Sequence, residues 1–380
     1  MPAAPATLAL GLVLAGSAGC DAAPPAGSLG IGPPLHVVGF NGAGQPAPDG
    51  GASGANFLPA DAIIQIAFDR LLHPSSVTRQ SFQLASESGT FPEPVVTYDP
   101  VARVVTLSSS NPTPGPWLTP GVTYTVTIGV SAANDYIGGS GPRAIDGAVM
   151  AEKVTEVFQV IASTTPTQPA DRTVSFCDDV IPIFQRECSG GLCHAASDHP
   201  AEGLILETPD GILNTLVGAT PRVSQESNTG GLAQPASAQG RLFGVDMPLV
   251  SANAEPGSGN PGASWLMYKV LLGQLRPIDD GLDAGAATCG EDGSVPAPVL
   301  QLPTPQPNLM LSPAEQQILS QYILGNQMPY PLNIPANEAT PASEVTPTSS
   351  TLPLTFQELE RIRAWIAQGA VVTQCTSCPQ

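Results

Sequence analysis

The hydrophobic periodicity of the chain changes once, near residue 170, and this change limits the folds that the chain can adopt. Between about residues 34 and 162, apolar and polar residues alternate in short runs rich in Val, Ile, Thr, Tyr and Phe. A period of two predicts β-strands. From residue 174 the apolar residues recur at intervals of three and four, which predicts amphipathic helices. We therefore expect an all-β part followed by a mainly α part.

Seven strand-like runs are expected in the first part, a number typical of a β-sandwich. They are LHVVGF, AIIQIAFD, SFQLA, PVVTYD, ARVVTLS, TYTVTIGV and VTEVFQVIA. The segment LTPGVTY, which ends at Tyr124, matches a tyrosine corner, in which a Tyr hydroxyl group near the start of a strand bonds back to the backbone. His73 stands next to Pro74 in a turn, with no other ligand type nearby, and is expected at the surface.

Three stretches of this part carry a family resemblance. IIQIAFDRLLHPSSVTRQSFQL, VTYDPVARVVTLS and LTPGVTYTVTIGVSAANDYIGG resemble the SbsA-type bacterial Ig-like domain of surface-layer and other exported proteins, over about residues 34–162. The resemblance implies an Ig-like β-sandwich that acts as a spacer or adhesion module, without chemistry of its own. Residues 163–173, rich in Pro and Thr, are expected to form a linker.

The N-terminus indicates export. An apolar run at residues 8–15 is followed by small residues and Cys20, which resembles a lipoprotein signal peptide of residues 1–19, cleaved before Cys20. Residues 20–33 are then expected to form a flexible linker. Ser17 stands where such signals usually have Leu, and no Lys or Arg precedes the run, so an ordinary secretory signal is the alternative. Acyl chains on Cys20 would anchor the protein to the outer membrane, on its periplasmic side or at the cell surface.

Charge and cysteine content narrow the choice of partners and cofactors. With a formal net charge of −19 and 12% charged residues, the chain is not expected to bind nucleic acid, and a partner steered by charge should be basic. Six cysteines remain besides Cys20: Cys177, Cys188, Cys193, Cys289, Cys375 and Cys378. An even number in an exported chain suits three disulfides, or two disulfides and one haem.

Three helices of the second part have clear sequence signals. The segments LSPAEQQILSQYILGN and LTFQELERIRAWIAQGA each begin with a capping box, Ser312 to Glu315 and Thr355 to Glu358, and each reaches a glycine at the end of the apolar pattern. VSFCDDVIPIFQREC has one apolar helical face, and Pro182 is expected to kink or restart that helix.

The stretch ECSGGLCHAASDHP carries the most specific chemical signal. Cys188 and Cys193 are separated by four residues, and His194 directly follows the second cysteine. Covalent haem attachment needs two thiols for the vinyl groups and a histidine that reaches the iron; two residues usually separate the thiols, and the two glycines here allow a wider loop. The alternatives are a Cys188–Cys193 disulfide that caps the helix and, least favoured, a zinc site that includes Cys177.

The order of these parts resembles the cytochrome c-like domains of exported, often lipid-anchored, proteins of myxobacteria and planctomycetes. The resemblance covers about residues 174–372, with long loop insertions, and its most specific pieces are the Cys-His stretch and the closing AWIAQGA. It implies that Cys188 and Cys193 hold haem c covalently, with His194 as the proximal axial ligand. Met328, in GNQMPYP, is the preferred distal ligand, and Met247, in GVDMPLV, is the second choice. Packing of either methionine in the core is the alternative.

The tail, residues 373–380, contains the last two cysteines. Cys375 and Cys378 either pair with each other or bond separately to Cys177 and Cys289. No Gly-x-Ser-x-Gly elbow, phosphate loop or HExxH motif occurs, so an enzyme is not expected. The sequence thus predicts a lipid-anchored electron carrier of the cell envelope, with one haem c on an Ig-like spacer. The alternative is a cofactor-free, disulfide-stapled surface lipoprotein with an adhesion or structural role.

Overall fold

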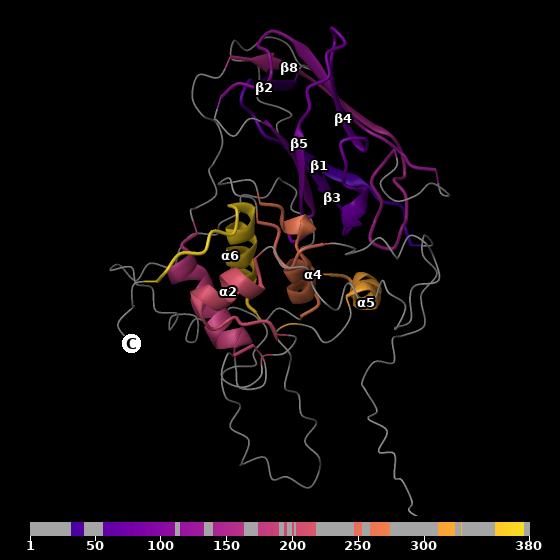
Figure 1. Ribbon diagram of the computed structural model, residues 1–380. Helices are drawn as coiled ribbons and strands as arrows, with labels where there is room; N and C mark the ends of the chain where they lie inside the picture. The colour runs from indigo at the N-terminus through magenta and orange to yellow at the C-terminus, as the bar shows by residue number, and fades with distance from the viewer. Residues whose placement is uncertain are drawn as a thin grey trace, which may run out of the picture.

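A computed structural model describes the two predicted parts of the chain but not every residue. The described residues are 32–41, 56–110, 115–132, 140–162, 174–189, 194–195, 200, 203–217, 247–252, 259–273, 311–323, 328 and 354–375. The predictions for the signal peptide, Cys20, the linker at 163–173, Cys193, Cys289 and Cys378 lie outside them. Strands occupy the N-terminal half and helices the C-terminal half (Figure 1).

The strands form two four-stranded sheets. The first has the order β1 (Val37–Asn41), β3 (Ile64–Phe68), β6 (Val104–Ser108) and β5 (Val95–Asp99); the second has β2 (Asn56–Pro59), β8 (Val154–Ile161), β7 (Thr123–Ile128) and β4 (Phe82–Ser86). All neighbouring strands are antiparallel except β2 and β8, which are parallel. Apart from β2, this is the strand order of immunoglobulin constant domains, so the predicted all-β sandwich is confirmed.

Each of the seven predicted runs contains a strand, and one further strand was not predicted. Strand β2, NFLP, has four residues, ends in proline and lacks alternation. Its backbone is held by pairing with β8, between Asn56 and Phe158 and onwards to Pro59 and Ile161. A partner about 100 residues away in the sequence leaves no local signal for such a strand.

The tyrosine corner is formed as predicted. The Thr119 backbone N–H donates to the Tyr124 hydroxyl oxygen at 3.1 Å, so the loop before β7 is fixed to the start of that strand. The Tyr124 ring is stacked with Phe158 of β8, with ring centroids 6.1 Å apart. The corner therefore joins a loop, two strands and the core between the sheets.

The helix that leads to Cys188 is irregular around Pro182. It consists of a π-helical turn η2 (Phe176–Val180), a short α-helix α1 (Ile181–Ile183) and a second π-helical turn η3 (Phe184–Cys188). Proline has no backbone N–H to bond to the carbonyl four residues earlier, so the helix departs from α geometry on both sides of it. The predicted disturbance at Pro182 is confirmed as a change of helix type.

The remaining helices are short. They are α2 (Pro209–Thr215), α4 (Trp265–Leu271), α5 (Pro313–Tyr322) and α6 (Phe356–Ala367), with 3-10 turns η1 (Pro74–Ser76) and η6 (Pro261–Ala263). Both predicted capping boxes are complete at the starts of α5 and α6. Helix α6 ends just before Gly369, whose φ of 99° suits glycine. No helix of the described ranges is long and apolar enough to cross a membrane.

The sandwich and the helices share one hydrophobic core. The helices lie against one end of the sandwich, next to the lower ends of β3 and β5 in the view of Figure 1. Buried side chains of both halves, from Phe68 and Phe82 in the strands to Tyr268 and Trp365 in the helices, belong to a single continuous cluster. The two halves of the described chain are therefore packed together rather than held apart.

Candidate functional site

The structure brings Cys188 and His194 together at the end of the irregular helix. Cys188 is the last residue of η3 and is buried. His194 is also buried, and its backbone N–H donates to the Cys188 carbonyl oxygen at 3.2 Å. Since Cys193 lies outside the described residues, the structure places two of the three residues of the predicted attachment site.

The imidazole of His194 is held in one tautomer. Its Nδ1 atom lies 3.2 Å from the backbone carbonyl oxygen of Leu204, and a carbonyl oxygen can only accept a hydrogen bond, so Nδ1 carries the proton. In the neutral ring, Nε2 is then the nitrogen with the lone pair. The Leu206 N–H also donates to the His194 carbonyl oxygen at 2.9 Å, so the segment before α2 holds both the ring and the backbone. Histidines that bind a metal are usually oriented by a hydrogen bond of this kind.

Aromatic side chains form an apolar wall next to this helix. Trp365 of α6 contacts Phe176, with ring centroids 5.8 Å apart, and Phe184, at 5.9 Å with the rings nearly perpendicular. Phe184 begins the turn that ends at Cys188. A haem group needs apolar surroundings, and these rings supply an apolar surface on the helix that ends at Cys188.

The contacts of the two candidate distal ligands, Met247 and Met328, do not show which of them would face the iron. Met247 is buried and belongs to the core, as the packing alternative expects. Met328 is half-buried against the same core, and its backbone N–H donates to the Lys269 carbonyl oxygen at 3.3 Å. The choice of Met328 over Met247 therefore stays a prediction.

A charged group that the sequence analysis missed lies directly beside Cys188. Glu187 is buried, and its carboxylate accepts a hydrogen bond from Arg186 Nε at 2.7 Å. Arg186 also contacts the buried carboxylate of Glu358, the residue that completes the capping box of α6. Burial by itself would lower the pKa of Arg186, but the two carboxylates outweigh it and raise that pKa. The capping box was visible in the sequence, whereas its arginine partner 172 residues away was not.

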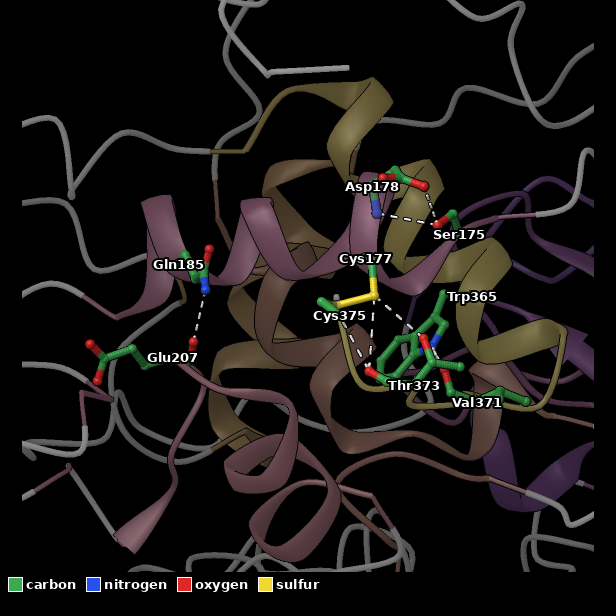
Figure 2. Close-up of a disulfide and its surroundings, with 9 residues drawn as sticks. All are labelled: Ser175, Cys177, Asp178, Gln185, Glu207, Trp365, Val371, Thr373 and Cys375. Carbon is green, nitrogen blue, oxygen red and sulfur yellow. Dashed lines mark hydrogen bonds between the residues drawn. A yellow bond between two sulfur atoms is a disulfide. The ribbon is translucent and has the colours of Figure 1, made fainter. Parts of the chain in front are cut away.

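One predicted disulfide candidate is confirmed with its partner. Cys375 is bonded to Cys177 (Figure 2), one of the three partners that the sequence left open for Cys375. This bond takes Cys177 out of the proposed zinc site, so the zinc interpretation that included it is wrong. No group of three or more His, Cys, Asp or Glu side chains suited to a metal ion occurs in the described part of the chain.

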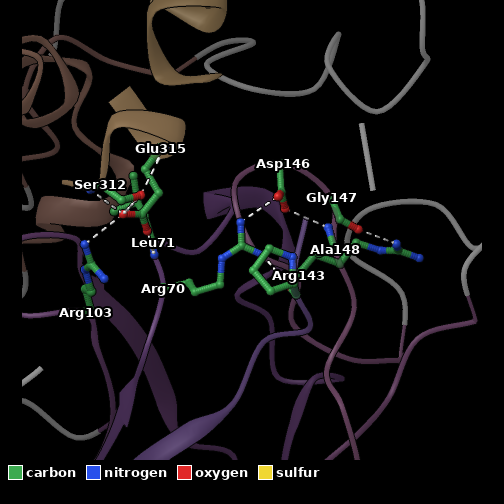
Figure 3. Close-up of polar contacts among 10 residues, drawn as sticks. Arg70, Leu71, Arg103, Arg143, Asp146, Gly147, Ala148, Ser312 and Glu315 are labelled. Atoms are coloured by element: carbon green, nitrogen blue, oxygen red, sulfur yellow. Dashed lines mark hydrogen bonds and ion pairs between the residues drawn. The ribbon is translucent and has the colours of Figure 1, made fainter. Parts of the chain in front are cut away.

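A buried carboxylate of α5 joins the helical half to the sandwich (Figure 3). Glu315 Oε2 accepts from Ser312 in the capping box and from Arg103 Nη2 at 3.0 Å, while Oε1 accepts from the Leu71 N–H at 2.7 Å. Arg103 and Glu315 are each about 4% exposed, so the pair is shielded from water. Arg103 also has a φ of 56°, a strained value for a residue with a side chain, in the turn between β5 and β6. The ion pair between its guanidinium group and Glu315 explains why this turn position holds arginine, although its φ would suit glycine.

The end of β5, just before this turn, makes a second connection to the helices. Asp99 Oδ2 accepts from Arg363 of α6 at 3.0 Å, and Arg363 also binds Glu360 at 3.2 Å. Gly262 of η6 lies so close to Tyr98 that a Cβ atom on the glycine would be 2.6 Å from the Tyr98 carbonyl oxygen. The turn between β5 and β6 is therefore enclosed by η6, α5 and α6.

His73, which lies against α5, is fully buried, so the prediction of a surface position is wrong. Its ring packs edge-on against Tyr322 of α5, with centroids 6.1 Å apart. Burial, together with the charge of Arg143, lowers the pKa of His73 to about 3. Local sequence places His73 in a turn, and only the packing of α5 against that turn buries it.

Comparisons with known proteins leave the function open. No family model and no curated protein matches the chain. Among solved structures, the native conformation of alpha-2-macroglobulin from Escherichia coli is 13% identical over 35% of this chain and 6% of that chain, with a TM-score of 0.24. The S-layer protein rSbsC is 16% identical over 38% of this chain and 16% of that chain, with a TM-score of 0.23. Likeness at this level assigns no function.

Proposed function

We propose that this protein is an electron carrier of the cell envelope, in which the helical half holds one haem c and the Ig-like half supports it. Cys188 and Cys193 would bind the haem covalently, His194 would be the proximal ligand, and Met328, or failing that Met247, the distal one. The haem would supply one-electron chemistry, and the chain its ligands and apolar surroundings. A basic redox partner would match the net charge of −19.

The observation that carries the proposal is the orientation of His194. It is buried next to Cys188, and the Leu204 carbonyl oxygen fixes its proton on Nδ1, which leaves Nε2 with the lone pair that iron binding requires. The aromatic wall of Trp365 and Phe184 adds an apolar setting. Export and a lipid anchor on Cys20 would place the protein where covalent haem is attached and disulfides persist.

Haem staining of a denaturing gel, with an absorption spectrum, tests this proposal. The full chain would be expressed with a signal peptide in a bacterium that has cytochrome c maturation machinery. We expect haem that survives denaturation and is absent from the Cys188→Ala/Cys193→Ala variant. The matched control, Cys177→Ser/Cys375→Ser, loses two cysteines elsewhere and should keep the haem. A colourless, folded wild-type protein would refute the proposal.

A second candidate function has its own support. The Cys177–Cys375 disulfide and the core shared by both halves are what a cofactor-free structural or adhesion protein would need in the envelope. In that case the wild-type protein is colourless, all of its exported thiols are oxidised, and Cys188 is bonded to Cys193. Mass spectrometry of peptides from the unreduced protein separates this outcome from the haem protein. The binding partner would then be sought on the Ig-like half.

A further inference from the structure

The C-terminal tail crosses the outside of the helical half and is held there by few contacts. After α6, residues 371–375 pass over Trp365, whose Nε1 donates to the Val371 carbonyl oxygen at 3.0 Å (Figure 2). Gln374 Nε2 donates to Asp210 of α2 at 2.7 Å. The disulfide from Cys375 to Cys177 is the covalent link. We call residues 371–375 the strap, because they join α6, α2 and η2 from outside.

The strap lies at the surface, unlike the core that it covers. Val371, Thr373 and Gln374 are exposed, and Cys177 and Cys375 are partly exposed. Trp365, directly beneath, is 2% exposed. A disulfide at the surface can be reached by another thiolate, whereas one inside a core cannot. Since the strap adds few buried side chains to the core, opening its disulfide does not require the core to unfold.

One neighbouring group can stabilise Cys177 when it leaves as a thiolate. The Thr373 hydroxyl group lies 3.4 Å from Cys177 Sγ and can donate a hydrogen bond to it. Asp178 and Asp179, in the same helical turn, disfavour a further negative charge. The Thr373 hydroxyl is therefore the neighbouring donor that offsets this repulsion when the disulfide opens.

We propose that the Cys177–Cys375 disulfide is a thiol–disulfide exchange site for a dithiol protein, and that its reduction releases the strap from Trp365. A thiolate of the partner attacks Cys375 Sγ, the bond to Cys177 breaks, and Cys177 leaves as a thiolate. The second thiol of the partner then attacks the mixed disulfide. The partner is oxidised to its disulfide, and its two protons end on Cys177 and Cys375. This inference does not depend on haem.

The consequence of reduction is local. The strap leaves Trp365, which gains exposure to water, while Phe176 and Phe184 still pack against its ring. The helix from Phe176 to Cys188 then loses its covalent tie to the C-terminus. The redox state of the surface disulfide is thereby transmitted to the helix that ends at the Cys-His site.

Native-state reduction of the full chain tests the inference. Dithiothreitol serves as the dithiol probe, trapped with a maleimide and mapped by peptide mass spectrometry, with far-ultraviolet circular dichroism and tryptophan emission followed in parallel. We expect Cys177 and Cys375 to be labelled while the circular dichroism is unchanged, with a red shift in emission that is absent from Trp365→Phe. Thr373→Val should slow the exchange about fivefold, the worth of one hydrogen bond, and Thr373→Ser should restore the rate.

One result would overturn the inference, and a second would overturn the role given to Thr373. Labelling of Cys177 and Cys375 only in denaturant that unfolds the chain would make the disulfide a permanent structural bond. Equal exchange rates in Thr373→Val and the wild type would remove the role of the hydroxyl group. The Cys177→Ser/Cys375→Ser variant, which has no disulfide at this position, controls for effects of dithiothreitol on other cysteines. The reduction test can be made whether or not the protein carries haem, so its result is separate from that of the haem experiment.

Discussion

The two halves of the molecule are stabilised in different ways. In the sandwich, neighbouring strands form continuous ladders, such as the six residue pairs of β7 and β8, and its aromatic residues pack between the sheets. In the helical half, α2, α4, α5 and α6 have 7, 7, 10 and 12 residues. Isolated helices of fewer than about 12–15 residues are marginal in water. These helices must therefore draw their stability from tertiary packing, both on one another and on the sandwich.

The polar contacts show the same difference. In the sandwich, Arg70 binds Asp146, and Arg143 binds the Gly147 carbonyl oxygen, so these arginines act within one half (Figure 3). In the helices, Glu315 and Arg363 bind across to Arg103 and Asp99 of the other half. The sandwich thus has polar contacts of its own besides those to the helices, while the helical half uses the sandwich as part of its structure.

Separation of the halves gives the largest expected effect. Residues 174–380 expressed alone should lack cooperative thermal unfolding, because the partners of Glu315 and Arg363 are missing. Residues 32–162 alone should keep it. Circular dichroism and calorimetry measure both. A full chain cut by a protease within residues 163–173 is the control, and its halves should stay associated during gel filtration. A helical half that unfolds cooperatively at the temperature of the full chain would contradict the comparison.

Arg103→Ala tests a single contact between the halves. It leaves the Glu315 carboxylate buried without its cation, which typically costs about 3–5 kcal/mol of unfolding free energy. Urea denaturation of the full chain measures the loss. Glu315→Gln keeps an N3 residue suited to a capping box and removes the charge, so it tests the ion pair without removing the cap.

The double variant Arg103→Ala/Glu315→Gln sharpens this result. Removing both charges should cost clearly less than the sum of the single changes, because no charge is left buried alone. Arg79→Ala, which breaks the exposed pair with Glu93, is the matched control and should change stability by no more than about 0.5 kcal/mol. Equal losses for Arg103→Ala and Arg79→Ala would mean that the contact between the halves contributes no more than an ordinary surface pair.

Those parts of the structure that depend on neighbouring residues were predictable from the sequence. Alternation predicted seven strands, the LTPGVTY segment predicted the bond to the Tyr124 hydroxyl, and the capping-box residues predicted the starts of α5 and α6. In each case the interacting groups are a few residues apart, so the local sequence contains both. Cys188 and His194 are both buried, which agrees with a site at the end of the irregular helix Phe176–Cys188. The haem itself stays a prediction.

Features that join distant segments were not predictable in this way. Strand β2 depends on β8, the burial of His73 depends on α5, and Arg103 and Glu315 are 212 residues apart. The sequence showed that Glu315 would cap a helix but gave no sign that the same carboxylate binds the sandwich. For the same reason the sequence suggested a spacer and a separate helical domain, and the contacts between them were missed.

The smallest of these effects is a pH dependence that arises where the halves meet. Folding keeps His73 buried beside Arg143 and Tyr322 and lowers its pKa from 6.5 to about 3, so below pH 6.5 the unfolded chain binds a proton that the folded chain does not. The contribution of His73 to stability is therefore fully present above pH 6.5 and is lost as the pH falls. Between pH 7.5 and pH 4.5 the loss is about 2.5 kcal/mol.

His73→Gln separates this contribution from the titration of carboxylates, which occurs in both proteins. Urea unfolding of the wild type and the variant, compared from pH 7.5 to pH 4.5, should show a stability difference that shifts in favour of the variant by that amount as the pH falls. Parallel profiles would mean that His73 takes up its proton without disturbing the fold. Because the ring lies against Tyr322 of α5, such a result would also argue that the sandwich and this helix separate easily. The helical half would then depend less on the sandwich than its contacts indicate.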